Sequence, residues 1–362
     1  MQTSIIRTVE ELSNIEHQWR EFMRHIENPE IFASWEWVES YIHHLMDPSK
    51  ELFIIVVTDQ DTCVAIAPLC IVSQKIIWRR ISTLQFIVAD VGDVNLIYIH
   101  KDCHGVKVLN QIIQVLLQHQ DEWDWIDLYN LQSSNPQTEL VKHFFGEQFD
   151  LFERKLSVLP YIDLMQYNDM KADKSRIKAI ERKERKLLRD HHDVTIKIFE
   201  PFDLQKWSNF IELHKQRWQD SLFNQPNNQA FFEEVLLQLH NQERTHLSYI
   251  EINGHVAAAW HTMIYADKAY MYMIASPKHY AEYGVGLVLT NRVIRHLMNT
   301  SSCLQEIDFL SGQQDYKFYW ADRVKINYHI RFINRARRTK LLRAYSFIQF
   351  NKQRLISLLT QR

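Results

Sequence analysis

The sequence predicts an α/β protein with two similar halves, in which mixed central sheets are flanked by helices. Short apolar runs rich in β-branched and aromatic residues alternate with amphipathic helical patterns along the chain. The order of these signals repeats, since "DTCVAIAPL" in the first half corresponds to "NGHVAAAWH" in the second, and "WDWIDLYNL" corresponds to "LQEIDFLSG". A length of 362 residues is also too long for one typical core and suits two domains, or one large one.

The first half, residues 1–165, begins with the strand "SIIRTV" and two helical patterns, at 9–25 and 34–46. A strand pair then surrounds a polar turn at Asp59–Thr62. Shorter strands are predicted at 76–78, 82–87 and 95–99, before a helix at 105–119 and the buried strand "WDWIDLYNL". A helix at 136–145 and a strand at 151–159 complete this half.

The second half, residues 166–334, opens with the strongly basic stretch "KADKSRIKAIERKERKLLRD", which includes Lys171 and Ala172. Further elements follow in order: a strand at 194–200, helices at 204–220 and 228–240, and three strands that begin with a hairpin at Asn253-Gly254. A helix at 285–298, the strand "LQEIDFL", a short helix and the strand "KINYHIRFI" end the half.

The last segment, residues 335–362, predicts a basic amphipathic helix that contains no acidic residue. Its apolar positions recur at near-helical spacing and include Leu341, Leu342, Tyr345, Ile348, Leu355, Leu358 and Leu359. We expect its first turns to pack on the core. Its end could also contact an anionic membrane surface or a partner.

Composition and charge make several classes of function less plausible for this sequence. A net charge of −2 gives no global field that would favour nucleic acid. No run reaches the roughly 18–20 apolar residues of a membrane span, and the first residues lack signal-peptide features, so we expect a cytoplasmic protein. The four cysteines form no CxxC pair, and "HKDCH" at His100–His104 is better explained as a polar loop, so no metal is expected.

The stretch "ASPKHYAEYGVGLVLTNRVIRHL" is the strongest local signal of a binding site. A strand ends at Ser276-Pro277, and Gly284 and Gly286 then open an amphipathic helix. Free N–H groups and the positive dipole end of a helix suit a pyrophosphate or a carboxylate. The alternative is a plain helix start with close packing on the sheet.

The stretch "DFLSGQQDYKFYW" adds a second candidate wall of the same site. Asp308 ends a buried strand, where ligands of open α/β sheets bind, and Gly312 allows a turn. Tyr316 and Trp320 share a face of the following turn, with Lys317 beside it. The alternative is an aromatic pair packed on the sheet with a solvated lysine.

These motifs resemble the GNAT superfamily acetyltransferases of the CelD/BcsL-like type, which are relatives of the Fem-type aminoacyl transferases. "LHKQRW", "EINGHVAAAWHTMI", "YMYMIASPKHYAEYGVGLVL" and "IDFLSGQQDYKFYWA" follow the family's order, and "IFASWEWVESY" is similar to its N-terminal aromatic motif. The resemblance implies two tandem GNAT-like domains, the first degenerate, and acetyl-CoA or another acyl-CoA as co-substrate. The general GNAT phosphate loop carries Gln or Arg where this chain has Ala281.

The GNAT-type reaction that the resemblance implies, together with local charge and sequence patterns, gives candidate roles for individual residues. Cofactor-binding candidates are Ile274, Ala275, Tyr283, Gly284, Val285 and Gly286. Asp308, His261 or a relayed water is the candidate base, Tyr316 and then Tyr319 the candidate acid, and Lys317 a group that orients the substrate. Substrate-binding candidates are Arg182, Arg185, Arg217, Trp218, Asp90, Asp93, Gly312 and Trp320. A solvated helix for Arg182 and Arg185, and a plain turn for Asp90 and Asp93, remain the alternatives.

Three functions remain open on the sequence. The first is acyl-CoA-dependent N-acylation of an amine on a sugar, a glycan or another small metabolite. The resemblance implies envelope or exopolysaccharide synthesis as its setting. The second is a Fem-like transferase that takes its aminoacyl group from tRNA, which the basic helix and Ala281 favour. The third is a non-catalytic module that binds an anionic polymer.

Overall fold

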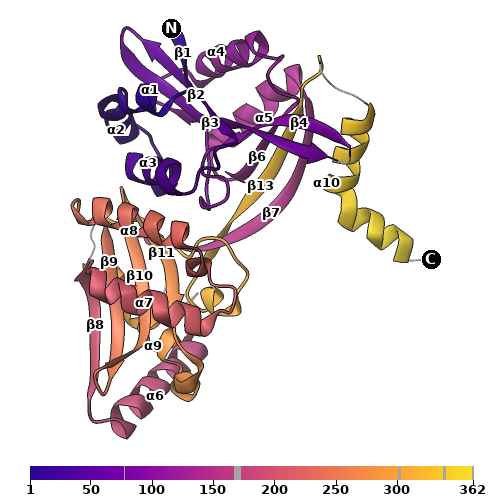
Figure 1. Ribbon diagram of the computed structural model, residues 1–362. Coiled ribbons are helices and arrows are strands. Elements are labelled where there is room, and N and C mark those ends of the chain that lie inside the picture. Colours follow the sequence, from indigo (N-terminus) through magenta and orange to yellow (C-terminus); the bar gives the residue numbers. More distant parts are fainter. Residues whose placement is uncertain (77, 167–172, 301–302, 337–339, 361–362) are drawn as a thin grey trace. The chain divides into compact units, whose positions relative to one another are not determined.

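The computed structural model describes residues 1–362 except 77, 167–172, 301–302, 337–339 and 361–362, and it describes 353–360 by backbone alone (Figure 1). The predicted positions Lys171, Ala172, Leu355, Leu358 and Leu359 therefore lie outside the described residues or side chains. The chain divides into two compact units. Unit 1 contains Met1–Val38, Met46–Ser157 and Ile326–Arg362, and unit 2 contains Glu39–Leu45 and Val158–Lys325.

This division differs from the predicted bounds at 165 and 334. Two long strands, β7 (Asp150–Asp163) and β13 (Arg323–Ile333), contribute residues to both units, as does α3 (Trp35–His44). The last strand was assigned to the second half because it follows that half in sequence. Its residues from Asn327 to Ile333 pair instead with Trp125–Gln132 of the first half.

Unit 1 is a mixed sheet with helices around it. Its strand order is β1-β2-β3-β4-β6-β13, and β5 pairs with β3. The strands are β1 (Gln2–Ile6), β2 (Lys50–Asp59), β3 (Thr62–Ile76), β4 (Arg79–Phe86), β5 (Tyr98–Ile99) and β6 (Trp125–Gln132). The helices are α1 (Val9–Ser13), α2 (Glu16–Arg24), η1 (Ile31–Ala33), α4 (Gly105–Gln118), α5 (Pro136–Gln148) and α10 (Lys340–Thr360). Gln60 and Asp61, both with positive φ, make the predicted turn between β2 and β3.

The first turns of α10 pack on unit 1. Leu342 and Ser346 are fully buried, and the ring of Tyr345 stacks on that of Trp125 with centroids 6.2 Å apart. Ile348 on the same helix is 58% exposed. Within the described part of the chain, no helix is long and apolar enough to cross a membrane.

The strands of unit 2 also form a mixed sheet arrangement, in the order β7-β12-β11-β10-β9-β8, where β7 contributes Tyr161–Asp163 beside β12. The other strands of the unit are β8 (Val194–Pro201), β9 (Thr245–Ile252), β10 (His255–Tyr265), β11 (Lys268–Ala275) and β12 (Glu306–Asp308). Its helices are α6 (Lys174–Asp190), α7 (Leu204–Arg217), η2 (Leu222–Asn224), α8 (Pro226–His240), η3 (Lys278–Tyr283), α9 (Val285–Thr300) and η4 (Asp315–Tyr319). Asn253 and Gly254 adopt positive φ and close the predicted β9–β10 hairpin.

Helices cover both faces of the unit 2 sheet (Figure 1). Trp260 packs in a core with residues of α6 and α9, whereas the ring of the next residue, His261, lies 5.5 Å from that of Trp207 on α7. Since neighbouring strand residues point to opposite faces, α6 and α9 cover one face and α7 covers the other. The resulting α/β architecture, with mixed sheets flanked by helices, is the fold class that the sequence predicts.

The pairing of β11 with β12 ends partway along β11. The two strands pair in parallel only from Lys268–Tyr270 on β11 to Glu306–Asp308 on β12, yet β11 continues to Ala275. On its other side β11 stays paired with β10, with a register shift that leaves Tyr272 as an extra residue. The edge of Met271–Ala275 that faces away from β10 therefore has no β12 residue opposite it.

Candidate functional site

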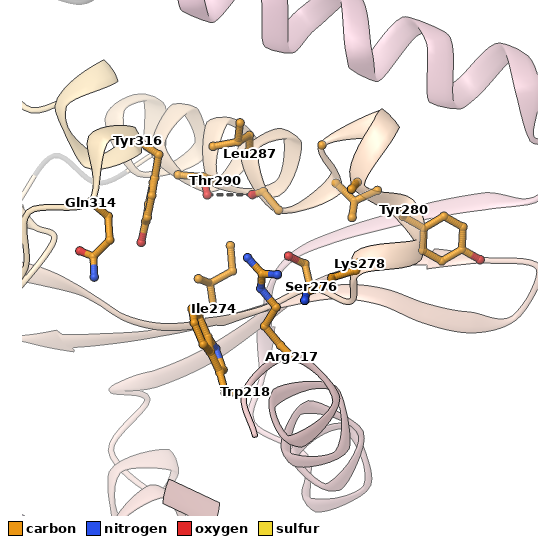
Figure 2. A pocket seen from close by; sticks show the side chains of 14 residues that line it. Arg217, Trp218, Ile274, Ser276, Lys278, Tyr280, Leu287, Thr290, Gln314 and Tyr316 are labelled. Carbon is orange, nitrogen blue, oxygen red and sulfur yellow. Dashed lines mark hydrogen bonds between the residues drawn. The ribbon is translucent and has the colours of Figure 1, made fainter. Parts of the chain in front are cut away.

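A cavity of about 410 Å³ lies where β11 ends and α9 begins. Figure 2 shows the guanidinium of Arg217 pointing from the end of α7 into the space below α9. Every residue that lines the cavity belongs to unit 2. The lining consists of Arg217, Trp218, Ile274, Ser276, Lys278, Tyr280, Ala281, Gly284, Val285, Gly286, Leu287, Thr290, Gln314 and Tyr316.

The two glycines at the start of α9 leave room for a ligand. Gly284 has φ of 56°, in the left-handed region, and a Cβ there would lie 3.0 Å from Cδ and 3.2 Å from Nζ of Lys183. A Cβ on Gly286 would lie 3.0 Å from the Ser276 Oγ and 3.3 Å from the Ile274 Cδ1. A side chain at either position would fill space beside the cavity, so glycine keeps the backbone accessible.

The helix start also supplies hydrogen-bond donors. The first N–H groups of an α-helix have no partner within the helix, and the positive dipole end favours an anion. In α9 these groups belong to residues that line the cavity, and Thr290 stabilises the first turn by donating from Oγ1 to the Gly286 carbonyl at 2.8 Å. The cavity thus combines close backbone access with anion-binding donors, which suits the pyrophosphate of coenzyme A.

The loop after β12 is held by two of the predicted catalytic residues. Asp308 is 1% exposed and accepts a hydrogen bond from the Leu310 N–H at 2.6 Å. Lys317 is 6% exposed and donates from Nζ to the carbonyls of Leu310 at 3.3 Å and Ser311 at 2.7 Å. Leu310 has φ of 60°, which is unfavourable for a residue with a side chain. These contacts fix a strained turn, and neither side chain lines the cavity.

The alternative of a solvated lysine at position 317 is therefore wrong. Trp320 is also buried, and its Nε1 donates to the Asn291 Oδ1 at 3.4 Å, so it joins this loop to α9. Gly312 has φ of 131° and makes the expected turn. The motif Asp-Phe-x-x-Gly-x-x-x-Tyr-Lys-x-x-Trp in this chain shapes a loop, and Tyr316 is the motif residue that reaches the cavity.

Tyr316 is the candidate proton donor on the cavity wall. Burial raises the pKa of its hydroxyl to about 12, so the hydroxyl keeps its proton at neutral pH. Figure 2 shows the hydroxyl end of Tyr316 directed to the same side as Gln314, across from Trp218. A protonated phenol in this place can donate a hydrogen bond or a proton to a group bound in the cavity.

His261 lies away from the cavity in the core of unit 2. Its side chain is fully buried, its Nε2 lies 2.8 Å from the Thr245 Oγ1, and its ring contacts those of Trp207 and Tyr272. Burial lowers the pKa of the imidazole to about 3, so it is neutral at physiological pH. This environment fits a packed core histidine.

The structure brings only part of the candidate set together. The predicted residues Arg217, Trp218, Ile274, Gly284, Val285, Gly286 and Tyr316 line the cavity, whereas Ala275, Tyr283, Asp308, Lys317, Gly312, Trp320, Tyr319 and His261 do not. Arg182 and Arg185 are exposed on α6 outside the lining. Asp90 and Asp93 belong to unit 1, in a loop closed by the Gly92 N–H donating to the Val88 carbonyl at 2.7 Å, which fits the plain turn.

Sequence reasoning missed several polar residues of the cavity: Ser276, Lys278, Tyr280, Thr290 and Gln314. It also missed Lys183, whose amine lies against Gly284. Ser276 and Lys278 stood in the quoted loop next to Ala275, so closeness to the strand end was a usable signal. Lys183 was one of many cations on a basic helix, and no pattern distinguished it from its neighbours.

Among the described residues, no group of three or more His, Cys, Asp or Glu side chains is placed to hold a metal ion. A comparison with curated protein sequences found no match. Residues 174–318 match the family model described as the acetyltransferase (GNAT) domain.

Solved structures share the fold over most of the chain. FemX matches with a TM-score of 0.58 and 11% identity, covering 90% of this chain and 97% of its own. A conserved protein of unknown function from Bacteroides thetaiotaomicron matches with a TM-score of 0.54 and 9% identity over 92% and 100%. The C-terminal domain of a putative lysylphosphatidylglycerol synthetase from Agrobacterium fabrum has a TM-score of 0.50 and 9% identity over 93% and 96%.

These likenesses concern the fold, whereas the family match covers the helix start, the open edge of β11 and the loop with Tyr316. The match to the acetyltransferase (GNAT) domain therefore covers residues 174–318, and this part of the chain carries the acyltransferase assignment.

Proposed function

We propose that unit 2 binds an acyl-CoA, acetyl-CoA in the first instance, in the 410 Å³ cavity and transfers its acyl group to an amine. The observation that carries this proposal is the junction of a glycine-lined helix start with a strand edge that has no β12 partner. Val285 and Gly286 would hold the pyrophosphate through backbone N–H groups, and Gly284, whose N–H donates to the Ala281 carbonyl, would leave room for it beside the helix start. The edge of Met271–Ala275 would pair with the amide groups of the pantetheine arm.

The co-substrate supplies a thioester carbonyl that an uncharged amine can attack. A backbone N–H of Met271–Ala275 would donate to the carbonyl oxygen as negative charge develops on it, and one such donor is typically worth about 2.7–4 kcal/mol. As the C–N bond forms and the C–S bond breaks, Tyr316 would donate its proton to the departing thiolate, since its hydroxyl stays protonated at neutral pH, and the proton lost by the nitrogen would return to the tyrosinate through solvent. Asp308 and Lys317 would act indirectly, by holding the loop that presents Tyr316.

The test is acyl transfer together with a matched change at the helix start. Purified protein is incubated with acetyl-CoA and a panel of amines, released thiol is measured, and acylated products are identified by mass. Gly284→Glu places a carboxylate at the start of α9, which repels a pyrophosphate, and should abolish turnover. Glu282→Gln serves as the control on the adjacent exposed position. Thiol release that is equal in Gly284→Glu and wild type would refute the proposal.

For the acceptor, we propose an amino group on a sugar, a glycan or another small metabolite. Support comes from the resemblance of the "DFLSGQQDYKFYWA" stretch to CelD/BcsL-like acetyltransferases, which also suggests envelope or exopolysaccharide synthesis as the setting. Metabolite extracts incubated with isotope-labelled acetyl-CoA would identify the acceptor by the labelled product. A product acetylated on oxygen would contradict an amine acceptor.

A second candidate is a Fem-like transferase that uses aminoacyl-tRNA. The observation in its favour is the exposed cationic surface of α6, where Arg182 and Arg185 have no carboxylate within salt-bridge distance among the described residues. The test is filter binding of charged tRNA at low salt, where phosphate contacts are strongest. Binding that weakens steeply with salt and in Arg182→Gln/Arg185→Gln would favour this candidate, and its absence would reject it.

A further inference from the structure

A second cavity, of about 550 Å³, adjoins the first in unit 2. It lies between the end of α7 and the loop that leads into η3. It is lined by Gln216, Arg217, Trp218, Gln219, Asp220, Pro277, Lys278 and His279. Arg217, Trp218 and Lys278 line both cavities, so the two spaces share a wall. A transferase needs a second binding space beside that of its acyl donor, and this cavity adjoins the proposed donor cavity.

The shared wall carries two cations without a carboxylate partner. Arg217 and Lys278 are exposed, and neither side chain forms an ion pair with any described acidic residue. Other cations of the same unit differ, since Lys186 pairs with Glu282 at 2.5 Å and Lys206 pairs with Glu251 at 2.5 Å. A helix C-terminus favours a cation, which accounts for Arg217 at the end of α7. Lys278 comes from another element, so the dipole of α7 does not explain why a second cation lines the same wall.

The exposed indole ring of Trp218 lines the same wall as the two cations. Trp218 is 46% exposed, and the guanidinium carbon of Arg217 lies 5.0 Å from its ring centroid. Figure 2 shows Trp218 reaching from the end of α7 toward Ile274, with Arg217 next to it. An exposed indole next to a planar guanidinium can stack on a ring while the guanidinium binds an anion with two parallel hydrogen bonds.

We propose that this second cavity binds the acceptor substrate, and that the acceptor is an amine that also carries a carboxylate or a phosphate group. Arg217 and Lys278 bind the anionic group, and Trp218 covers a sugar ring or an apolar face beside it. The inference rests on the proposed acyltransferase function of the first cavity and adds the chemical class of its second substrate.

The experiment compares matched probes that differ in charge. Protein saturated with CoA is titrated calorimetrically with glucosamine 6-phosphate against glucosamine, and with 4-aminobenzoate against 4-aminobenzamide. The first pair tests for a phosphate and the second for a carboxylate. In at least one pair we expect the anionic probe to bind about tenfold tighter than the neutral one, as for a charge-assisted pair. Equal affinity within both pairs would overturn the inference.

Variants locate the effect. Arg217→Gln and Lys278→Gln should each remove most of the difference between anionic and neutral probes, whereas Arg182→Gln should retain it. Arg182 is the matched control because it is an exposed cation of the same unit outside both cavities. A difference that survives in both Arg217→Gln and Lys278→Gln contradicts the assignment. If these variants weaken CoA instead and leave the probes unaffected, the two cations serve the acyl donor and the inference fails.

CoA affinity, measured first, separates this inference from the proposed function. If CoA does not bind, the probes are titrated into the protein alone. Discrimination of anionic probes that depends on Arg217 would then support an anion site while the acyltransferase proposal fails. Binding of CoA without such discrimination would leave the acyltransferase proposal standing and reject the anionic acceptor.

Discussion

Replacing Lys317 by methionine separates a structural role of this lysine from a catalytic one. Its Nζ donates to the carbonyls of Leu310 and Ser311 inside a mostly buried turn. A hydrogen bond from a charged group contributes about 1.5–3 kcal/mol. Methionine keeps most of the apolar stem, and water can reach the half-buried Ser311 carbonyl. We therefore expect Lys317→Met to lower the free energy of unfolding by about 2–4 kcal/mol.

The assay has two readouts. Urea unfolding followed by tryptophan fluorescence gives stability, and hydrogen exchange measured by mass spectrometry shows whether protection is lost in the peptide that spans residues 308–320. Lys278→Met is the control, because this lysine is exposed and should leave both readouts unchanged. If Lys317→Met unfolds at the wild-type urea midpoint and keeps wild-type exchange while kcat falls, the ammonium group acts on the reaction itself and our reasoning is refuted.

Three further predictions concern titratable groups of unit 2. Tyr316→Phe should lower kcat by about 10²–10⁴-fold and barely change the KM for acetyl-CoA; with a pKa of about 12, the wild-type hydroxyl should cause no loss of rate between neutral pH and about pH 10. If the kcat of Tyr316→Phe is within about twofold of the wild-type value, Tyr316 is not the proton donor. Burial, followed by the charge of Asp308, raises the pKa of Glu306 to about 7, so the folded state binds its proton more tightly than the unfolded state does. The free energy of unfolding should therefore fall as pH rises from about 4.5 to about 7 and then level off. This fall should be smaller in Glu306→Gln, and urea unfolding midpoints measured across this pH range test both expectations. The imidazole of His261, whose pKa burial lowers to about 3, should not titrate between about pH 5 and pH 8 in NMR spectra, and a titrating His261 signal would contradict its place in the core.

Local signals predicted the parts of the site that depend on backbone conformation. Gly284 was identified because it opens a helix directly after a strand, and its φ of 56° is one that few residues other than glycine adopt. The hairpin at Asn253-Gly254 was predicted because this dipeptide favours positive φ at both positions, and both residues adopt it. Gly312 also makes a turn, with φ of 131°.

Contacts between distant segments could not be predicted in this way. The environment of Lys317 depends on a strained turn at Leu310. Because this residue is not a glycine, the sequence did not indicate its positive φ. Strand β13 pairs with β6, so that Ile333 lies opposite Trp125, which is far away in sequence. The alternation of apolar residues predicts a strand but does not predict which strand it pairs with. Lys278 and Arg217 line the same cavities although they come from different elements of unit 2, and no sequence pattern links them.

The most direct measurement is a calorimetric titration of the protein with acetyl-CoA, repeated on Gly286→Val. A Cβ at this position would lie 3.0 Å from the Ser276 Oγ, so valine crowds the start of α9 on the cavity side. Gly146→Val on α5 is the control, since a Cβ there would meet only Leu151 at 3.8 Å. The account predicts binding of one acetyl-CoA to the wild type and the control, and a loss of affinity of about tenfold or more in Gly286→Val. Absence of binding to the wild type, or equal affinity in Gly286→Val, would contradict it.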